Sequence, residues 1–240
     1  DSSNIVVNST PDASITNPGT LCIGQGTQTI SAASAGAFTS TPFITTAGLF
    51  SPSIAGSGLH KIYFIATDAN NCSDTDSTVI LVDNTPDASI APTTPICETQ
   101  KVLQLMANQA GGSFSGGPYV SASGQFDGTV AKAGSHTVTY TITSAAGCTA
   151  SDNINVDVVG IPTNTLTLAA DKGCEPFDLD ISTESAYSLD WSFNNGTIQN
   201  KDNIKQTLTK GTYPITLVVK NSTGCIQNLD TTITVFGNPT

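Results

Sequence analysis

The sequence predicts an all-β protein made of three tandem β-sandwich domains. Three observations support this prediction. Six cysteines recur in phase along the chain. Short segments of alternating apolar and polar residues are separated by Gly, Asn and Pro, which is typical of strands and turns. No stretch of ten residues has helical periodicity, and seven or so short strands in about 76 residues fit a β-sandwich.

The cysteines form three pairs with nearly constant spacing: Cys22 and Cys72, Cys97 and Cys148, Cys174 and Cys225. The two members of a pair lie 50, 51 and 51 residues apart. First cysteines recur after 75 and 77 residues, and second cysteines after 76 and 77. This regularity indicates three like repeats, and paired cysteines indicate an oxidising, extracellular compartment. Domains of this size have marginal cores, which disulfides commonly stabilise.

Repeated words and prolines mark the predicted domain boundaries. The sequence TPDASI at residues 10–15 recurs at 85–90, and IPT at 161–163 resembles NPT at 238–240. The predicted repeats are therefore residues 10–84, 85–160 and 161–240. Residues 1–9 are expected to be the last strand of a preceding repeat, because DSSNIVV aligns with DSTVILV in the first repeat. We therefore expect a window on a longer array.

Each repeat is expected to end in a hairpin. The clearest strands are residues 62–65, 138–142 and 215–219. Polar turns follow at 68–71, 144–147 and 221–224, and second strands at 78–82, 154–158 and 232–235.

The composition excludes several classes of function. Asp and Glu number 19 against 8 Lys and Arg, for a net charge of −11, which argues against binding to nucleic acid or to anionic membranes. No apolar run approaches the ~20 residues that span a bilayer, so direct membrane insertion is not expected. With no C-x-x-C and only two histidines, the cysteines fit no zinc pattern.

Repeat three resembles the polycystic-kidney-disease (PKD) type of immunoglobulin-like domain. The matching words are GCEPFDL at 173–179, WSFNNG at 191–196, GTYPITL at 211–217 and GC at 224–225. The family's Trp-x-Phe-Gly-Asp-Gly is altered, since Asn194 and Asn195 replace the Gly-Asp. Repeats one and two lack the Trp and resemble related repeats in very large surface proteins of Bacteroidota. The matching words, which lie in repeat two, are GSFSG at 112–116, GQF at 124–126, GSHTVTY at 134–140 and GC at 147–148.

The resemblance covers the whole chain and refines the predicted fold to three tandem immunoglobulin-like (PKD-like) β-sandwich domains in an extended array. It implies a structural stalk segment of a large secreted cell-surface adhesin, of the gliding-motility type exported by type IX secretion. Its partners would be neighbouring repeats, with a surface polysaccharide or protein ligand bound through other domains. The alternative is a carbohydrate- or protein-binding accessory module of a secreted multidomain hydrolase, because PKD-like domains accompany such enzymes. The chain itself is not expected to be an enzyme.

Four side chains invite a functional reading but favour a structural one. His60 and His136 occupy one repeat position, which Tyr213 fills in repeat three. Immunoglobulin sandwiches place a Tyr near this corner, where it bonds backbone. A catalytic role is disfavoured, because repeat three would lack the histidine. Trp191 would be either a sugar-stacking platform or a core residue, and the family pattern favours the core.

Two further sites are weaker expectations. Asp68, Asn70, Asp74 and Asp76 place oxygen ligands around one hairpin turn, which suits calcium but also suits ordinary turn chemistry. Repeat two has no carboxylate at this turn, so calcium would bind repeat one alone, and no other cofactor is expected. The words DST and DTT resemble the O-glycosylation sequon of Bacteroidota, with the glycan on Ser77 or Thr231.

The pairing of the cysteines stays open between two schemes. Equal spacing favours disulfides within each repeat. In an immunoglobulin-type sandwich, however, the first cysteine precedes strand B and the second follows the F–G turn, at opposite ends. A strand of seven residues spans about 23 Å, whereas a disulfide needs Cα atoms within about 7 Å. The staggered alternative bonds Cys22 to Cys148 and Cys97 to Cys225, and leaves Cys72 and Cys174 for domains outside this window.

Overall fold

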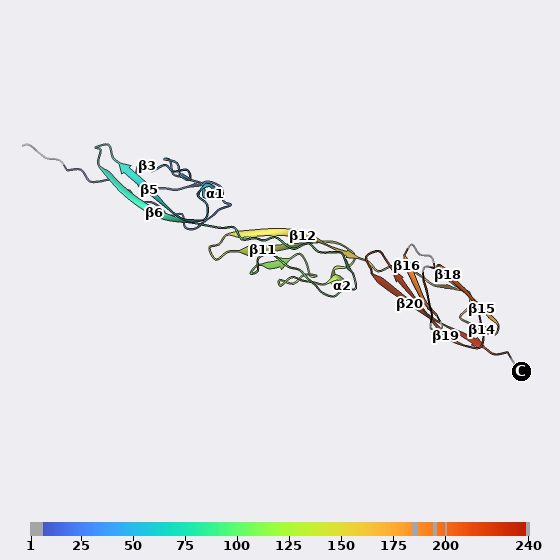
Figure 1. The fold of residues 1–240 in the computed structure, drawn as a ribbon. Coiled ribbons are helices and arrows are strands. Elements are labelled where there is room, and N and C mark those ends of the chain that lie inside the picture. Colours follow the sequence, from blue (N-terminus) through green and yellow to red (C-terminus); the bar gives the residue numbers. More distant parts are fainter. Residues whose placement is uncertain (1–6, 184–186, 194–195, 200, 239–240) are drawn as a thin grey trace, which may run out of the picture. The chain divides into compact units, whose positions relative to one another are not determined.

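A computed structural model describes residues 7–183, 187–193, 196–199 and 201–238. Within these ranges the chain forms twenty strands and two single-turn helices, so the all-β prediction is confirmed (Figure 1). The chain divides into two compact units, residues 1–89 with 107–113 and 140–152, and the remaining residues 90–106, 114–139 and 153–240. The three predicted repeats stay a prediction as domains. Residues 1–6 of the expected preceding strand, and the turn at Asn194 and Asn195, lie outside the described residues.

The first repeat builds a four-stranded sheet of order β1-β6-β5-β3 and a two-stranded sheet of β2 and β4. Its strands are β1 (Leu21–Cys22), β2 (Gln28–Thr29), β3 (Gly36–Phe38), β4 (Leu49–Phe50), β5 (Gly58–Thr67) and β6 (Ser73–Asp83). The antiparallel β5–β6 hairpin alternates: Ile62, Phe64 and Ala66 are buried, while Tyr63 and Ile65 are exposed. The hairpin exceeds the predicted 62–65 and 78–82 because polar residues extend both strands.

The second repeat has the same arrangement, with a sheet of order β7-β12-β11-β9 and a pair β10-β8. Its strands are β7 (Ile96–Cys97), β8 (Leu103–Gln104), β9 (Ser113–Ser115), β10 (Gln125–Phe126), β11 (Gly134–Thr143) and β12 (Thr149–Val159). One-turn helices precede the long hairpins of both repeats, namely α1 (Pro52–Ala55) and α2 (Gly128–Ala131). Asp127 caps α2 by accepting from the amides of Thr129 and Val130.

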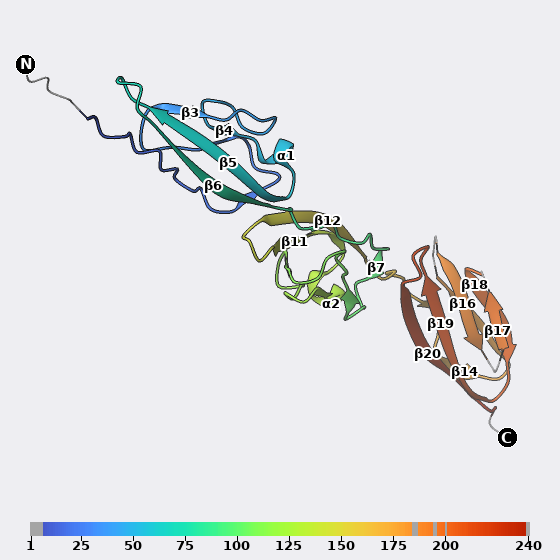
Figure 2. The same cartoon turned by 60° about the vertical axis from the view of Figure 1, so that its left-hand side comes forward.

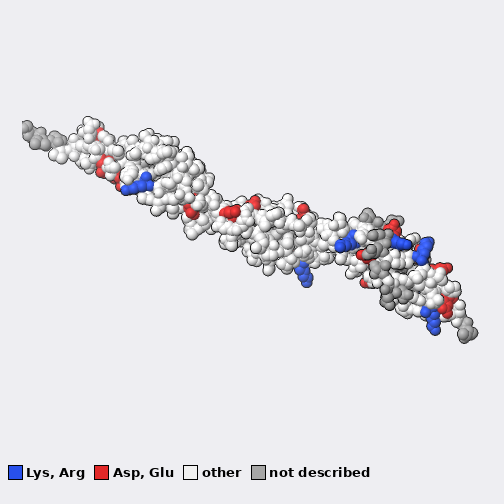
Figure 3. Space-filling view, viewed as in Figure 1, with Lys and Arg blue, Asp and Glu red and all other residues white. Residues whose placement is uncertain are grey.

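The third repeat is more regular, with sheets of order β14-β20-β19-β16-β17 and β13-β15-β18. Figure 2 shows the long strands of the five-stranded sheet. The strands are β13 (Thr167–Leu168), β14 (Lys172–Cys174), β15 (Phe177–Ser182), β16 (Ser188–Phe193), β17 (Gly196–Gln199), β18 (Asn203–Leu208), β19 (Gly211–Lys220) and β20 (Ile226–Phe236). Its core contains Trp191, Leu217 and Ile233, all fully buried. The face drawn in Figure 3 carries scattered charged side chains on a mostly uncharged surface, as the low charged fraction of 11% requires.

The repeated word TPDASI has a structural reason in its aspartate. The carboxylate of Asp12 accepts from the amide of Ser14, and that of Asp87 accepts from the amide and hydroxyl of Ser89. These bonds lower the pKa of both carboxyls, with the Ser89 hydroxyl the largest cause at Asp87 and the Ser14 amide the largest at Asp12. The same short Asx turn therefore shapes the chain at the start of two of the repeats.

We predict that Asp87 titrates below the ordinary aspartate value of 3.8, and that Ser89→Ala raises its pKa. Because the folded-state pKa is lowered, this carboxylate contributes stability above the unfolded-state value, and that contribution is lost as pH falls through the folded-state pKa. Carboxyl-carbon NMR titration measures the shift. The exposed Ser115→Ala serves as control, and equal Asp87 titration in both variants would contradict the prediction.

Candidate functional site: two disulfide joints

The second cysteine of every repeat ends a turn of one design, here called the cysteine turn: residues 68–72, 144–148 and 221–225. Its first side chain accepts a hydrogen bond from the amide of the cysteine. The acceptors are Asp68 Oδ1 at 2.8 Å, Ser144 Oγ at 3.2 Å and Asn221 Oδ1 at 2.9 Å. The fourth residue has positive φ, at Asn71 (62°), Gly147 (91°) and Gly224 (94°), which Gly and Asn tolerate best. Three different sequences thus present a cysteine in the same way.

The first cysteine of every repeat lies on a short edge strand, here called the cysteine edge. Strands β1, β7 and β14 run parallel to the ends of β6, β12 and β20, which pairs Cys22 with Asp83, Cys97 with Val159 and Cys174 with Phe236. In each case the residue after the cysteine donates its amide to the carbonyl of that partner at 2.9 Å. The edge is therefore fixed to the C-terminal end of the last strand of its own repeat.

The structure joins edges to turns in the staggered scheme. Disulfides link Cys22 to Cys148, with Cα atoms 5.6 Å apart, and Cys97 to Cys225, with Cα atoms 5.4 Å apart. Pairing within repeats is wrong for these four cysteines. The physical reason is the eleven-residue β6, which separates the turn of repeat one from its edge by about 35 Å. That distance is far beyond the reach of a disulfide.

Each disulfide is one part of a larger joint. In joint 1, Ser144 Oγ donates to Asp83 Oδ2 at 2.7 Å, beside the Cys22–Cys148 bond. In joint 2, Asn221 Nδ2 donates to the carbonyl of Gly160 at 3.2 Å, beside the Cys97–Cys225 bond. The first residue of the cysteine turn therefore binds its own cysteine and also the C-terminal end of the last strand of the preceding repeat, at Asp83 of β6 or at Gly160 directly after β12.

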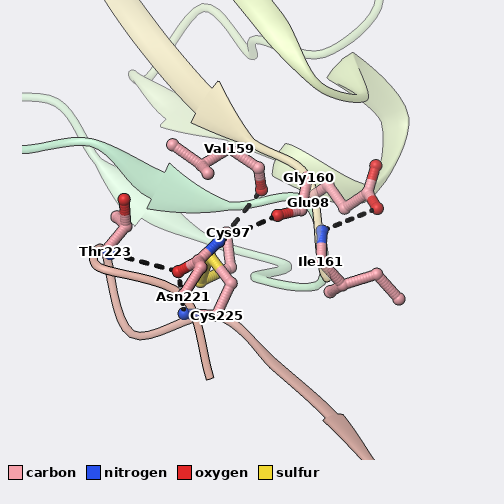
Figure 4. The surroundings of a disulfide bond; sticks show 8 residues. All are labelled: Cys97, Glu98, Val159, Gly160, Ile161, Asn221, Thr223 and Cys225. Carbon is pink, nitrogen blue, oxygen red and sulfur yellow. Dashed lines mark hydrogen bonds between the residues drawn. A yellow bond between two sulfur atoms is a disulfide. The ribbon is translucent and has the colours of Figure 1, made fainter. Parts of the chain in front are cut away.

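Figure 4 shows joint 2, where the cysteine turn of repeat three lies against the C-terminal end of β12, the last strand of repeat two. Glu98 Oε1 accepts the amide of Ile161 at 3.2 Å and so fixes the chain that leaves the strand. The sulfur of Cys225 lies 3.7 Å from the carbonyl of Val159, a packing contact because a bonded sulfur carries no proton. The turn cysteines Cys148 and Cys225 are each only 1% exposed. Their burial leaves both disulfides poorly accessible to attacking thiolates.

Two cysteines remain free in this structure, Cys72 on a turn and Cys174 on an edge. That they pair with further domains stays a prediction. Sequence reasoning missed the partners around the sulfurs, namely Asp83, Gly160, Ser144 and Asn221. A polar residue at the first turn position of all three repeats was the sequence signal that could have identified Ser144 and Asn221. No such signal identified Asp83 and Gly160, because they lie about sixty residues away from the turns that bind them.

The corner residues bind the backbone in one way. His60 Nε2 bonds the carbonyl of Gly56 at 2.8 Å, His136 Nε2 that of Lys132 at 2.9 Å, and the Tyr213 hydroxyl that of Thr209 at 2.9 Å. All three acceptors lie four residues upstream. This geometry agrees with a structural corner and not with a catalytic histidine. Trp191 is fully buried and donates its indole N–H to the carbonyl of Lys201 at 2.7 Å, so it offers no platform to a sugar.

The calcium candidates are used locally. Asp68 caps its turn through bonds from Asn70 and Cys72, and Asp76 accepts from the amides of Ile15 and Ser77. Among the described residues no three His, Cys, Asp or Glu side chains group so as to hold a metal ion, and Asp74 is no exception. Calcium binding stays an expectation from the sequence.

The two glycosylation candidates occupy equivalent strands. Ser77 lies on β6 and Thr231 on β20, and both are partly buried. Glycosylation of these residues stays a prediction.

An open groove of about 1060 Å³ lies on repeat three. Its lining residues are polar: Thr163, Asn164, Thr165, Thr167, Ser182, Thr183, Lys201, Asp202 and Asn203. None of them is aromatic, so the groove lacks the stacking surface that sugar sites use.

No family model and no curated protein sequence matches the chain. Solved structures with a similar fold include a Ca²⁺-stabilised adhesin with which an Antarctic bacterium binds ice (12% identity, TM-score 0.33, covering 97% of this chain and 75% of that one). Others are fibronectin(III)-like modules of Clostridium thermocellum CbhA (14%, 0.32, 62% and 94%) and the N-terminal four Ig domains of Dscam1 (8%, 0.30, 97% and 74%). The fold is an all-β, immunoglobulin-like tandem array, which its own sheets establish. Within the described part of the chain, no helix is long and apolar enough to cross a membrane.

We predict that non-reducing peptide mapping of the oxidised chain yields the peptides Cys22–Cys148 and Cys97–Cys225. Thiol labelling before denaturation should mark only Cys72 and Cys174. Recovery of a Cys22–Cys72 or a Cys97–Cys148 peptide as the main product would exclude the staggered joints.

The substitution Asn221→Ala should lower the free energy of unfolding by about 1–2 kcal/mol, because the amides of Thr223 and Cys225 and the carbonyl of Gly160 lose their partner. Urea denaturation with the disulfides intact measures the change. The exposed neighbour Ser222→Ala is the matched control. Equal midpoints for the two variants would show that the cap contributes nothing.

Proposed function

We propose that this chain is a structural stalk segment of a large secreted cell-surface adhesin, in which disulfide joints carry tension between repeats. The observation that supports this proposal is the covalent connectivity made by the two joints. Buried disulfides of this kind form in oxidising compartments, which supports a location outside the cytosol.

The staggered bonds connect the two joints by three separate pieces of chain. Joint 1 contains Cys22 and Cys148, and joint 2 contains Cys97 and Cys225. Residues 22–97, 97–148 and 148–225 therefore all run from one joint to the other. Disulfides within repeats would leave a single chain between successive repeats, so the staggered scheme triples the covalent connection.

This connectivity limits how far the protein can be stretched. The backbone from Cys22 to Cys225 has 203 peptide units, but the shortest of the three pieces, from Cys97 to Cys148, has 51. Fully extended, these correspond to about 710 Å and about 180 Å. An unfolding event under load would thus release a small fraction of the length that a reduced chain would release. A stalk exposed to shear requires this property.

The same connectivity resists proteolysis. A protease must cut all three pieces before joint 1 separates from joint 2. A single cut in one of these pieces leaves joint 1 and joint 2 covalently linked through the other two. Extracellular proteins meet proteases without the protection of the cell, so this resistance suits a surface location.

The finer assignment rests on the resemblance of the sequence words. They support PKD-like repeats of a Bacteroidota adhesin, exported by type IX secretion and serving gliding motility or surface attachment, with polysaccharide or protein ligands bound through other domains. The rival, a sugar-binding accessory module of a hydrolase, lacks its main residue because Trp191 is buried. A non-catalytic structural role also agrees with His60 and His136 being engaged with backbone carbonyls.

Single-molecule pulling on the chain from its two ends tests the proposal, with Cys72→Ser and Cys174→Ser present throughout. When fully unfolded and extended, the chain should span about 180 Å between Cys22 and Cys225 in the oxidised protein and about 710 Å in the reduced protein. Removing joint 2 with Cys97→Ser and Cys225→Ser leaves 77 units, or about 270 Å, as the shortest route. Equal lengths for oxidised and reduced protein would overturn the tension-bearing role.

A further inference from the structure

Half of a third joint is present at each of two places in this chain. Cys72 sits on a complete cysteine turn without an edge, and Cys174 sits on a complete cysteine edge without a turn. We propose that two copies of this chain join head to tail, by a disulfide between Cys174 of one copy and Cys72 of the second. This inference names one source for the further domains to which these two cysteines are expected to bond, namely a second copy of the chain, and it does not depend on the stalk proposal.

The cysteine edge at Cys174 has the same backbone pairing as the two edges whose cysteines are bonded. Cys174 pairs in register with Phe236, and the amide of Glu175 donates to the carbonyl of Phe236 at 2.9 Å. The bonds at Cys22 and Cys97 are the same in direction and length. The edge is therefore already formed and needs no rearrangement to accept a turn.

The unfilled turn is equally complete. Asp68 Oδ1 accepts the amide of Cys72 at 2.8 Å, and the amide of Asp68 donates to the carbonyl of Cys72 at 3.0 Å. Ser144 and Asn221 make the matching backbone bonds to Cys148 and Cys225. The partner that fits an edge is thus this turn, and the chain itself supplies one.

Exposure distinguishes the unfilled halves from the filled joints. The bonded turn cysteines are 1% exposed, whereas Cys72 is only partly buried. Cys174 is exposed, while its bonded counterparts Cys22 and Cys97 are partly buried. Next to Cys174 the apolar ring of Phe236 is 52% exposed. Docking of a turn would cover this ring and both sulfurs.

Charge favours the turn of repeat one over the other turns. In joint 2 the turn residue Asn221 reaches Gly160, which lies beside the small Ala133 (a Cβ built on Gly160 would be 3.5 Å from Ala133 Cβ). The equivalent of Gly160 at the unfilled edge is Gly237. There the aliphatic chain of Lys210 takes the place of Ala133, and its Cδ would be 3.3 Å from a Cβ built on Gly237.

An incoming Asp68 carboxylate therefore meets the lysine that the other edges lack. Asp68 cannot donate to the carbonyl of Gly237 as Asn221 donates to that of Gly160, so the Lys210 ammonium supplies the missing donor. Glu175 also lies beside Gly237, with Oε1 3.6 Å from the built Cβ, while its Oε2 accepts the backbone amide of Lys210. The ammonium would then lie between two carboxylates and offset their repulsion.

The bond forms by thiol–disulfide exchange with a small disulfide such as oxidised glutathione. The Cys174 thiolate attacks one glutathione sulfur and releases one glutathione thiolate, which gives a mixed disulfide. The Cys72 thiolate of the second copy attacks the Cys174 sulfur and releases the second glutathione. Two protein thiols are oxidised to one disulfide and one glutathione disulfide is reduced to two thiols, so the electrons balance.

The test uses the full chain with joints 1 and 2 oxidised, incubated with oxidised glutathione and run on non-reducing gels. The unsubstituted chain should give a ladder of dimers and longer polymers. Cys72→Ser and Cys174→Ser should each stay largely monomeric alone, and an equal mixture of the two should give a dimer and no longer species. Peptide mapping of that dimer should recover Cys72 bonded to Cys174.

Charge reversal separates a built interface from random oxidation. Lys210→Glu in the Cys72→Ser partner should slow formation of the mixed dimer about three-fold or more at low salt, with the difference reduced at high salt. Lys220→Glu, at the other end of β19, makes the same change in net charge and should have little effect. Dimers linked Cys72–Cys72 or Cys174–Cys174, a bond between Cys72 and Cys174 of one copy, or thiols that stay free would each overturn the proposal.

Discussion

The length of the last strand of each repeat is the constraint on which the rest of this structure depends. Strands β6, β12 and β20 each have eleven residues and carry the cysteine turn at one end and the cysteine edge at the other. A disulfide cannot reach from one end to the other. Each cysteine therefore needs a partner from a different repeat, and a framework that would otherwise stabilise isolated domains connects successive ones.

That choice changes what a disulfide contributes. The bonds at Cys148 and Cys225 close loops with sequence separations of 126 and 128, more than twice those of a pair within one repeat. In the chain-entropy view each such bond stabilises the folded state by about 4–5 kcal/mol, only slightly more than a 50-residue loop would give. The gain in free energy is therefore small, and the main consequence is connectivity. Small repeats with marginal cores become coupled, because unfolding one cannot lengthen the protein until its neighbours also yield.

Much of this architecture could be predicted from the sequence. The alternation at 62–65 and 215–219 located the long hairpins. The staggered pairing was raised by the expected places of the cysteines at opposite ends of an immunoglobulin-type sandwich, together with the length of a strand. Trp191 and the corner residues followed from the resemblance. The two-residue strands β1 and β7 could not be found, because they exist only through parallel pairing with a strand about sixty residues away. The proximity of Lys210 to Gly237 has a different origin, because the two residues flank the open end of the antiparallel β19–β20 hairpin.

The joints also differ from one another in a side chain that determines which cysteine turn pairs favourably with which edge. Ser144 donates its hydroxyl to the carboxylate of Asp83, and Asn221 donates its amide to the carbonyl of Gly160. Asp68 has no proton to donate and needs a cation. Placed on the edge of repeat one, it would face Asp83, and the two carboxylates would repel each other. A common backbone frame therefore lets any turn fit any edge in shape, while one side chain per joint determines which pairs are favourable.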